Sequence, residues 1–275
     1  MDGSLSADEL AQVKTLLHGS QNLAVAIEDA AADRPADGSS AAEELARQGG
    51  FAGSWGSEPL TLVHVHGQRL AASAADHVVA LASLVDLQVG GTAAATLVGH
   101  LAHASTSVWW VWDPSLELRG RLARGWTDAW RWANDRDRPP RDAPVTAQVL
   151  NAAAQQLGFD VVGDPPVAID EPRPSTAALV DAMAADLSSA LRQRLLAAVE
   201  DALSAPLAVP ARSAGAGGEA ARDQPGGDVV AVTGLAALVY VEAFARKAAY
   251  YGWDQSRWRA WQAHTRATLE QSIGR

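Results

Sequence analysis

The chain has 275 residues, with ten tryptophans, no cysteine and a formal net charge of −10. The lack of cysteine excludes disulfides and thiolate chemistry, and the negative charge opposes binding to nucleic acid and to anionic membranes. No stretch is long and apolar enough to span a bilayer, and the N-terminus lacks a secretory signal pattern. These features favour a cytoplasmic protein that binds neither nucleic acid nor membrane.

The first predicted helix begins at a capping box. Ser6 and Glu9 have the spacing in which the serine accepts from a backbone amide and the glutamate reaches back, and the apolar pattern then runs through Ile27. Residues 33–57 mix Pro, Gly, Ser and Ala around a short helical patch near 43–47. This composition is typical of a flexible connection.

Two long helices are predicted to follow as a hairpin. Pro59 is suited to start the first, which covers 60–88, and Gly90-Gly91 ends it. Thr92 can cap the second, which reaches Trp112. Because the connection is short, we expect the two helices to be antiparallel.

The middle of the chain contains more prolines. Asp113-Pro114 predicts the cap and first residue of a third helix that ends before Pro139, and a short helix over 144–157 is predicted to close at Gly158. Residues 159–174 combine valines with prolines and form the only strand candidate.

The last third returns to helical patterns. Ser175 is predicted to cap a long helix through Leu203, and residues 206–227, rich in Ala, Gly and Pro, are predicted to be flexible. Residues 229–251 are apolar on nearly every side, which is typical of a central helix, and Asp254 can cap the final one.

The helical pattern shows no clear restart, so residues 1–275 are predicted to form one domain. The predicted fold is all-α, an antiparallel bundle of about seven to eight helices with a small extended excursion near 159–174.

Glu242 is the only carboxylate between residues 229 and 251. A carboxylate in such an apolar helix is costly unless it is paired, so we expect either an ion pair with Arg246, one turn away, or a raised pKa suited to proton transfer. The structural ion pair and the general acid or base are both open at this point.

Histidines gather in the predicted hairpin. His77 lies about as far before the Gly90-Gly91 turn as His103 lies after it, and His100 shares a helical face with His103. These spacings predict an acid/base pair with Asp76 as an orienting group, or simply hydrogen-bonded histidines. Neither His-x-x-x-His nor Glu-x-x-His spacing is present in this hairpin, so no metal site is expected.

The tryptophans occur in helix-spaced or adjacent sets. Trp110, Trp112, Trp126 and Trp130 are typical of a core, but in a bundle of Ala, Leu and Val their rings can also line a cavity. Arg69, on the same predicted face as His66 and Asp76, is a further candidate ligand-binding residue. His100 and Arg246 are also expected to bind the ligand, as polar groups of the pocket.

Three resemblances bear on function. The run from His66 to Leu84, with the Trp109–Pro114 segment, resembles a group of helical bacterial proteins without an assigned activity. Residues 134–137, Asn-Asp-Arg-Asp, resemble the acidic metal motif of class I terpene cyclases, but an arginine interrupts the run and no second metal motif follows. Arg259 and His264 have the Arg-x4-His spacing of HEPN-type ribonucleases.

The expected function is that of a helical protein with a Trp-lined apolar pocket that binds or converts a hydrophobic small molecule. An enzyme of this kind is expected to catalyse an acid/base isomerisation or cyclisation of terpenoid or polyketide-like substrates, without a cofactor. Glu242 and a histidine then act as acid and base. The alternatives are a non-enzymatic interaction module that forms a homodimer and a HEPN-like ribonuclease.

Overall fold

The computed structural model describes residues 7–31, 34–53, 56–86, 92–133, 152, 154–163, 168–204 and 229–272. The predicted flexible segment 206–227, the Asn-Asp-Arg-Asp motif at 134–137 and most of the predicted helix over 144–157 lie outside these residues. The described residues confirm the predicted all-α bundle, with a single two-stranded sheet among them.

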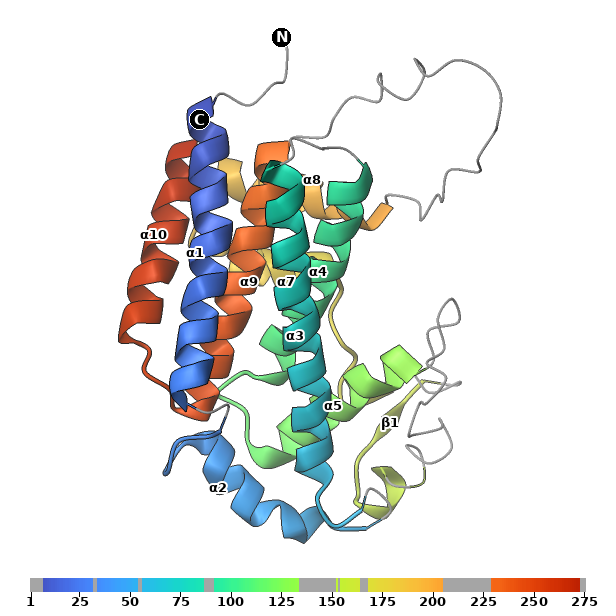
Figure 1. Ribbon diagram of the computed structural model, residues 1–275. Coiled ribbons are helices and arrows are strands. Elements are labelled where there is room, and N and C mark those ends of the chain that lie inside the picture. Colours follow the sequence, from blue (N-terminus) through green and yellow to red (C-terminus); the bar gives the residue numbers. More distant parts are fainter. Residues whose placement is uncertain are drawn as a thin grey trace, which may run out of the picture.

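Long helices run side by side through the bundle (Figure 1). They are α1 (Ala7–Ala31), α3 (Pro59–Asp86), α4 (Thr92–Val111), α9 (Val229–Tyr251) and α10 (Ser256–Ser272). α3 and α4 form the predicted antiparallel hairpin, and α9 packs against α1, α3, α4 and α10. Every residue from Ala231 to Phe244 is buried, which confirms α9 as the central helix.

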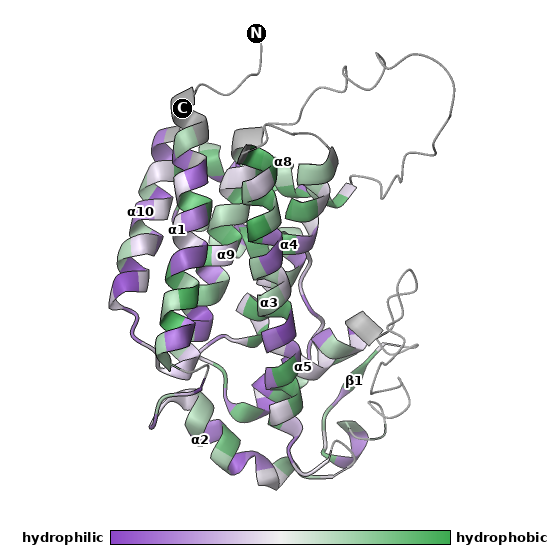
Figure 2. Ribbon diagram, in the orientation of Figure 1, coloured by the Kyte–Doolittle hydropathy of each residue, from purple (hydrophilic) through white to green (hydrophobic). Residues whose placement is uncertain are grey.

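The outer helices are amphipathic, whereas α9 is not. Hydrophilic residues recur along α1 and α10 in Figure 2, and the apolar side chains of α1 that are buried, such as Leu16, Leu17 and Ala24, face the bundle. An apolar stripe on one side of a helix is buried by packing against its neighbours. Burial of these stripes therefore orients α1 and α10 around α9.

Shorter elements cover one end and the back of the bundle (Figure 1). Helix α2 (Ser40–Arg47) and the 3-10 turn η1 (Gln48–Phe51) lie at the end where α5 (Leu118–Ala133) crosses α3. Strands β1 (Val161–Val162) and β2 (Ala168–Ile169) pair antiparallel in the predicted extended excursion.

The described part of the segment 33–57, residues 34–53 and 56–57, has more structure than its composition indicated. Ser39 caps α2, its Oγ accepting from the amide of Ala42 at 3.2 Å. Glu44 and Gln48 are buried, and Gln48 Oε1 accepts from the amide of Leu60 at 3.0 Å. Its flexibility stays a prediction, but these contacts tie the segment to the start of α3.

The helix predicted over 175–203 is two helices, α7 (Thr176–Met183) and α8 (Ser189–Ser204). The predicted cap is present, since Ser175 Oγ accepts from the amide of Ala178 at 3.1 Å. The chain turns at 184–188, where Glu270 of α10 accepts from the amide and the hydroxyl of Ser188 at 2.6 and 2.7 Å. Ser188 Oγ also accepts from the amide of Leu191 at 3.4 Å, so the residue bound by Glu270 is the one that caps α8.

The third predicted helix also starts later than expected. Asp113 Oδ1 accepts from the amide of Ser115 at 3.0 Å and forms a turn, so α5 begins at Leu118. Arg121 binds the carbonyl oxygens of residues 111, 113 and 116. These bonds satisfy carbonyls that a continuous helix would have used.

Candidate functional site

A small pocket lies inside the bundle between α1, α3, α4 and α9. Its volume is about 120 Å³. The lining residues are Glu28, Gln68, Ala71, Ala72, Ala74, Ala75, Ser105, Val108, Tyr240, Ala243, Phe244 and Lys247. Five of the twelve are alanine, and a methyl group at these helix-facing positions leaves space that a leucine would fill. We call this space the alanine pocket.

A buried hydroxyl without a partner lines the alanine pocket. Ser105, on α4, has 0% exposed surface, and its Oγ makes no hydrogen bond. Two residues later, Ser107 is equally buried, but its Oγ donates to Asp128 Oδ1 at 2.9 Å. An unsatisfied buried polar group costs about 1–3 kcal/mol, so Ser105 is a site where a ligand can supply the missing partner.

An ion pair lies at one side of the alanine pocket. Lys247 Nζ binds Glu28 Oε1 at 2.5 Å, and the lysine side chain is 3% exposed whereas the glutamate side chain is 33% exposed. Tyr240 adds a phenol to the lining. Burial and the charge of Glu28 raise the pKa of Tyr240 well above its ordinary value, so its hydroxyl is kept protonated.

Aromatic rings surround the Lys247 ammonium. Its Nζ lies 5.0 Å from the ring centre of Trp253, 5.7 Å from Trp112, 5.9 Å from Tyr251 and 6.0 Å from Phe244. Ring faces at these distances attract a cation. The charge of Lys247 is therefore stabilised by the rings as well as by Glu28.

Glu242 and Arg246 do not form the ion pair with each other that the sequence suggested. Glu242 accepts from Arg266 Nε at 3.0 Å and from Gln262 Nε2 at 2.8 Å, both on α10. Arg246 pairs with Asp113 at 2.8 Å. The i, i+4 spacing of Glu242 and Arg246 would permit a bond within α9, but each side chain binds a residue on another segment of the chain.

Both residues nevertheless line one groove, with a volume of about 360 Å³, between α7, α9 and α10. Arg246 lies over the ring of Trp109 at 3.4 Å, and Trp109 lines the same groove. The groove is separate from the alanine pocket, because no residue lines both. Glu242 is thus held in a buried ion pair beside a polar groove.

The predicted grouping of His77, His100 and His103 is present only in part. The rings of His77 and His100 lie 5.7 Å apart across α3 and α4, and each Nδ1 binds a backbone carbonyl of its own helix, Ser73 and Thr96 respectively. His103 is exposed.

The histidines of the hairpin are not in contact with Glu242, the other acid/base candidate. Asp76 and Arg69 are exposed on α3. Within the described ranges, no hydrogen bond, ion pair or ring contact joins Glu242 to His77, His100 or His103. The acid and base groups expected to act together therefore lie in different places.

The four candidate tryptophans belong to the core. Trp110, Trp112, Trp126 and Trp130 are all at most 5% exposed. None of them lines the alanine pocket, whose lining includes five alanines, one Phe and one Tyr. Trp112 packs so closely on α3 that a Cβ on Gly67 would lie 2.4 Å from its ring.

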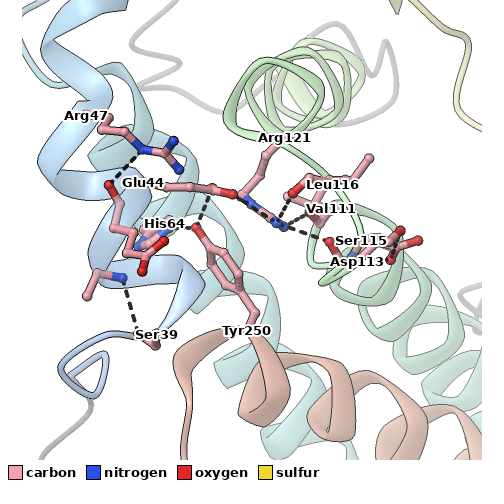
Figure 3. A network of polar contacts seen from close by, with 12 residues as sticks. Ser39, Glu44, Arg47, His64, Val111, Asp113, Ser115, Leu116, Arg121 and Tyr250 are labelled. Atoms are coloured by element: carbon pink, nitrogen blue, oxygen red, sulfur yellow. Dashed lines mark hydrogen bonds and ion pairs between the residues drawn. The ribbon is translucent and has the colours of Figure 1, made fainter.

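A buried polar network that the sequence did not indicate joins α2, α3, α5 and α9 (Figure 3). Arg121, 0% exposed, binds Glu44 through Nε at 2.7 Å, and the hydroxyl of Tyr250 donates to the same carboxylate at 2.9 Å. His64 Nε2 lies 3.0 Å from Tyr250 Oη, and Tyr251 Oη lies 3.3 Å from His64 Nδ1.

The donor and acceptor in each bond between Tyr250, His64 and Tyr251 follow from the Glu44 carboxylate, which can only accept. Because Tyr250 donates to the carboxylate, its oxygen accepts from His64 Nε2–H, and the unprotonated Nδ1 accepts from Tyr251. Burial and the nearby charge of Arg121 lower the pKa of His64 to about 4, consistent with this neutral ring. The network is satisfied internally, which favours a structural role.

A second buried network centres on Asp128. Its carboxylate accepts from His66 Nε2 at 2.9 Å and lies 3.2 Å from Arg173 Nε. Burial raises the pKa of Asp128, but the His66 bond and the charge of Arg173 outweigh it and hold the pKa at about 2. Arg173 also donates to Thr106 and Ser107 of α4. This network attaches the chain after β2 to the hairpin.

Arg259 and His264 lie on α10, and both are exposed. Five residues on a helix correspond to a rotation of about 140° between the two side chains. Arg259 donates to Gln255 at 2.7 Å, and the ring of His264 lies 5.1 Å from that of Trp261.

In the ranges that the structure describes, no three His, Asp or Glu side chains form a group that could hold a metal ion. No helix within those ranges is long and apolar enough to cross a membrane.

No family model, curated protein or solved structure matches the chain. The resemblances drawn from the sequence therefore stay predictions, and functional inference depends on the geometry alone.

None of the residues that line the alanine pocket was predicted from the sequence, and only Lys247 has a feature in the sequence that could have drawn attention to it. Lys247 is one of two lysines beside twenty arginines. Glu28 and Ser105 have no such signal, because their importance comes from the α1–α9 and α3–α4 packing that brings them to one space.

Proposed function

We propose that this protein binds a small, largely hydrophobic molecule, the size of one ring or a short chain, in the alanine pocket. The observation that carries the proposal is the buried, unpartnered hydroxyl of Ser105 at an apolar space. Apolar cavities of about 150 Å³ accommodate benzene. The alanine pocket is somewhat smaller, at about 120 Å³, so a single ring with one polar substituent would have to displace some lining side chains outward as it fills the space and satisfies Ser105.

The volume narrows the ligand class expected from the sequence. Sites for drug-sized ligands measure about 300–1,000 Å³, so a pocket of about 120 Å³ favours a compact molecule over a terpenoid or polyketide chain. The separation of Glu242 from the histidines removes support for acid/base cyclisation through those residues. Binding is therefore the activity that the geometry supports best.

Benzyl alcohol is a suitable probe, because it is uncharged and combines a ring with one hydroxyl. Isothermal titration calorimetry should show saturable binding to the wild type, and nuclear magnetic resonance shifts should map to the lining residues. Ala75→Leu, which adds apolar volume at the pocket, should abolish binding while the circular dichroism spectrum stays helical. Absence of saturable binding, or equal binding by Ala75→Leu, would refute the proposal.

Ser105 and Ser107 give a matched pair on one helix. Ser105→Ala should leave the free energy of unfolding unchanged or raise it, because it removes a hydroxyl without a partner, and it should weaken benzyl alcohol binding. Ser107→Ala should lower stability by about 1–3 kcal/mol, because Asp128 and Arg173 lose a partner, and leave binding unchanged. A large loss of stability in Ser105→Ala would show that its hydroxyl is already satisfied.

A further inference from the structure

The two members of the Glu28–Lys247 pair differ in how firmly they are held. The lysine is 3% exposed and lies among four aromatic rings, whereas the glutamate is 33% exposed. If the carboxylate leaves, the rings still stabilise the ammonium through cation–π attraction, and Glu28 can be solvated. Glu28 is thus the member that another anion can replace at low cost.

The choice of lysine at 247 is itself unusual in this chain, which has arginine at twenty of its twenty-two Lys and Arg positions. An ammonium is a compact point charge with three donors, whereas a guanidinium is a wide planar fork. The compact head group is suited to the ring-lined space beside the pocket. Lys247 also lines the alanine pocket, where the head group of a ligand can reach it.

The remaining polar groups of the pocket are also suited to an anion. Ser105 Oγ has no partner and can donate, and the hydroxyl of Tyr240 is another donor in the lining. Lys247 already binds a carboxylate oxygen at 2.5 Å. Glu28 therefore demonstrates, within the protein, the chemical group that this position accepts.

Taking the proposed binding function as its basis, we propose that the alanine pocket selects small carboxylates. The carboxylate of the ligand replaces Glu28 on Lys247 and accepts from Ser105, and its ring or short chain occupies the space between the alanines. Glu28 acts as an internal competitor that keeps Lys247 paired when the pocket is empty.

The test compares benzoate, benzyl alcohol and benzylamine, which share a ring and differ in the charge of the head group, by calorimetry on the full chain. Wild type should bind benzoate more tightly than the other two. Lys247→Met should weaken benzoate binding by at least about tenfold, as expected for loss of one partner of a buried charge pair, and should weaken benzyl alcohol binding by a smaller factor, so that the preference for benzoate over benzyl alcohol falls.

The direction in which Glu28→Gln changes the benzoate affinity decides whether Glu28 competes with the ligand. Removing the competing carboxylate should strengthen benzoate binding several-fold and should increase the ratio of benzoate affinity to benzyl alcohol affinity. This variant keeps the Lys247 ammonium among its aromatic rings, so it tests the proposal even if Lys247→Met does not fold. Weaker benzoate binding in Glu28→Gln, or a preference for benzylamine, would overturn the proposal.

The two proposals fail in different ways. If benzyl alcohol binds but benzoate does not, the pocket binds small molecules without selecting carboxylates. If neither ring compound binds, the proposed function itself is refuted, and the carboxylate proposal with it.

Discussion

Replacement of Arg121 by methionine tests the network of Figure 3 directly. The guanidinium makes two bonds to Glu44, at 2.7 and 3.4 Å, and three to the carbonyl oxygens of Val111, Asp113 and Leu116, at 2.8, 3.1 and 3.2 Å. Methionine retains the apolar stem but leaves the buried carboxylate without its cation. Breaking a buried pair in this way costs about 3–5 kcal/mol, a large part of the about 5–15 kcal/mol that stabilises a typical domain.

Urea denaturation followed by tryptophan fluorescence and circular dichroism measures this loss. Combining Glu44→Gln with Arg121→Met removes the carboxylate that Arg121→Met alone leaves unpaired. The double variant should therefore lose less stability than the two single variants together, and the difference is a coupling energy of about 1–3 kcal/mol. Arg192→Met, at a half-exposed pair with Asp181, is the control and should shift the midpoint much less. Additive single effects would refute the claim that Arg121 and Glu44 act as a pair.

Three further predictions concern stability. Gly67→Ala should lower the free energy of unfolding by about 1–3 kcal/mol, because its methyl group would lie 2.4 Å from the Trp112 ring; an unchanged melting temperature would show that the ring can move. Burial and a nearby guanidinium lower the pKa of His64 to about 4, so the unfolded chain binds a proton below pH 6.5 that the folded chain excludes. Wild type should therefore lose stability between pH 6.5 and 4 more steeply than His64→Gln, and parallel pH profiles would contradict this. Ser175→Ala should cost about 1 kcal/mol through loss of the α7 cap to Ala178, and Ser175→Asp should restore it.

The fold class and most long helices were determined by the sequence, because the signals involved are local. Apolar periodicity, the Gly90-Gly91 break and Pro59 depend on residues a few positions apart, and the hairpin and the central helix 229–251 follow from them. The break between α7 and α8 was not accessible in this way. At this break Ser188 is bound by Glu270, which lies 82 residues away in the sequence, so a local pattern cannot show this contact.

The candidate site was decided by tertiary structure. Helix spacing permits Glu242 to pair with Arg246, but it cannot show that Arg266 on another helix competes more successfully. The sequence likewise shows that tryptophans are spaced for burial without showing whether they line a cavity. A pocket is space left by side chains on several helices, so the meeting of Glu28, Ser105 and Lys247 exists only once α1, α4 and α9 have packed.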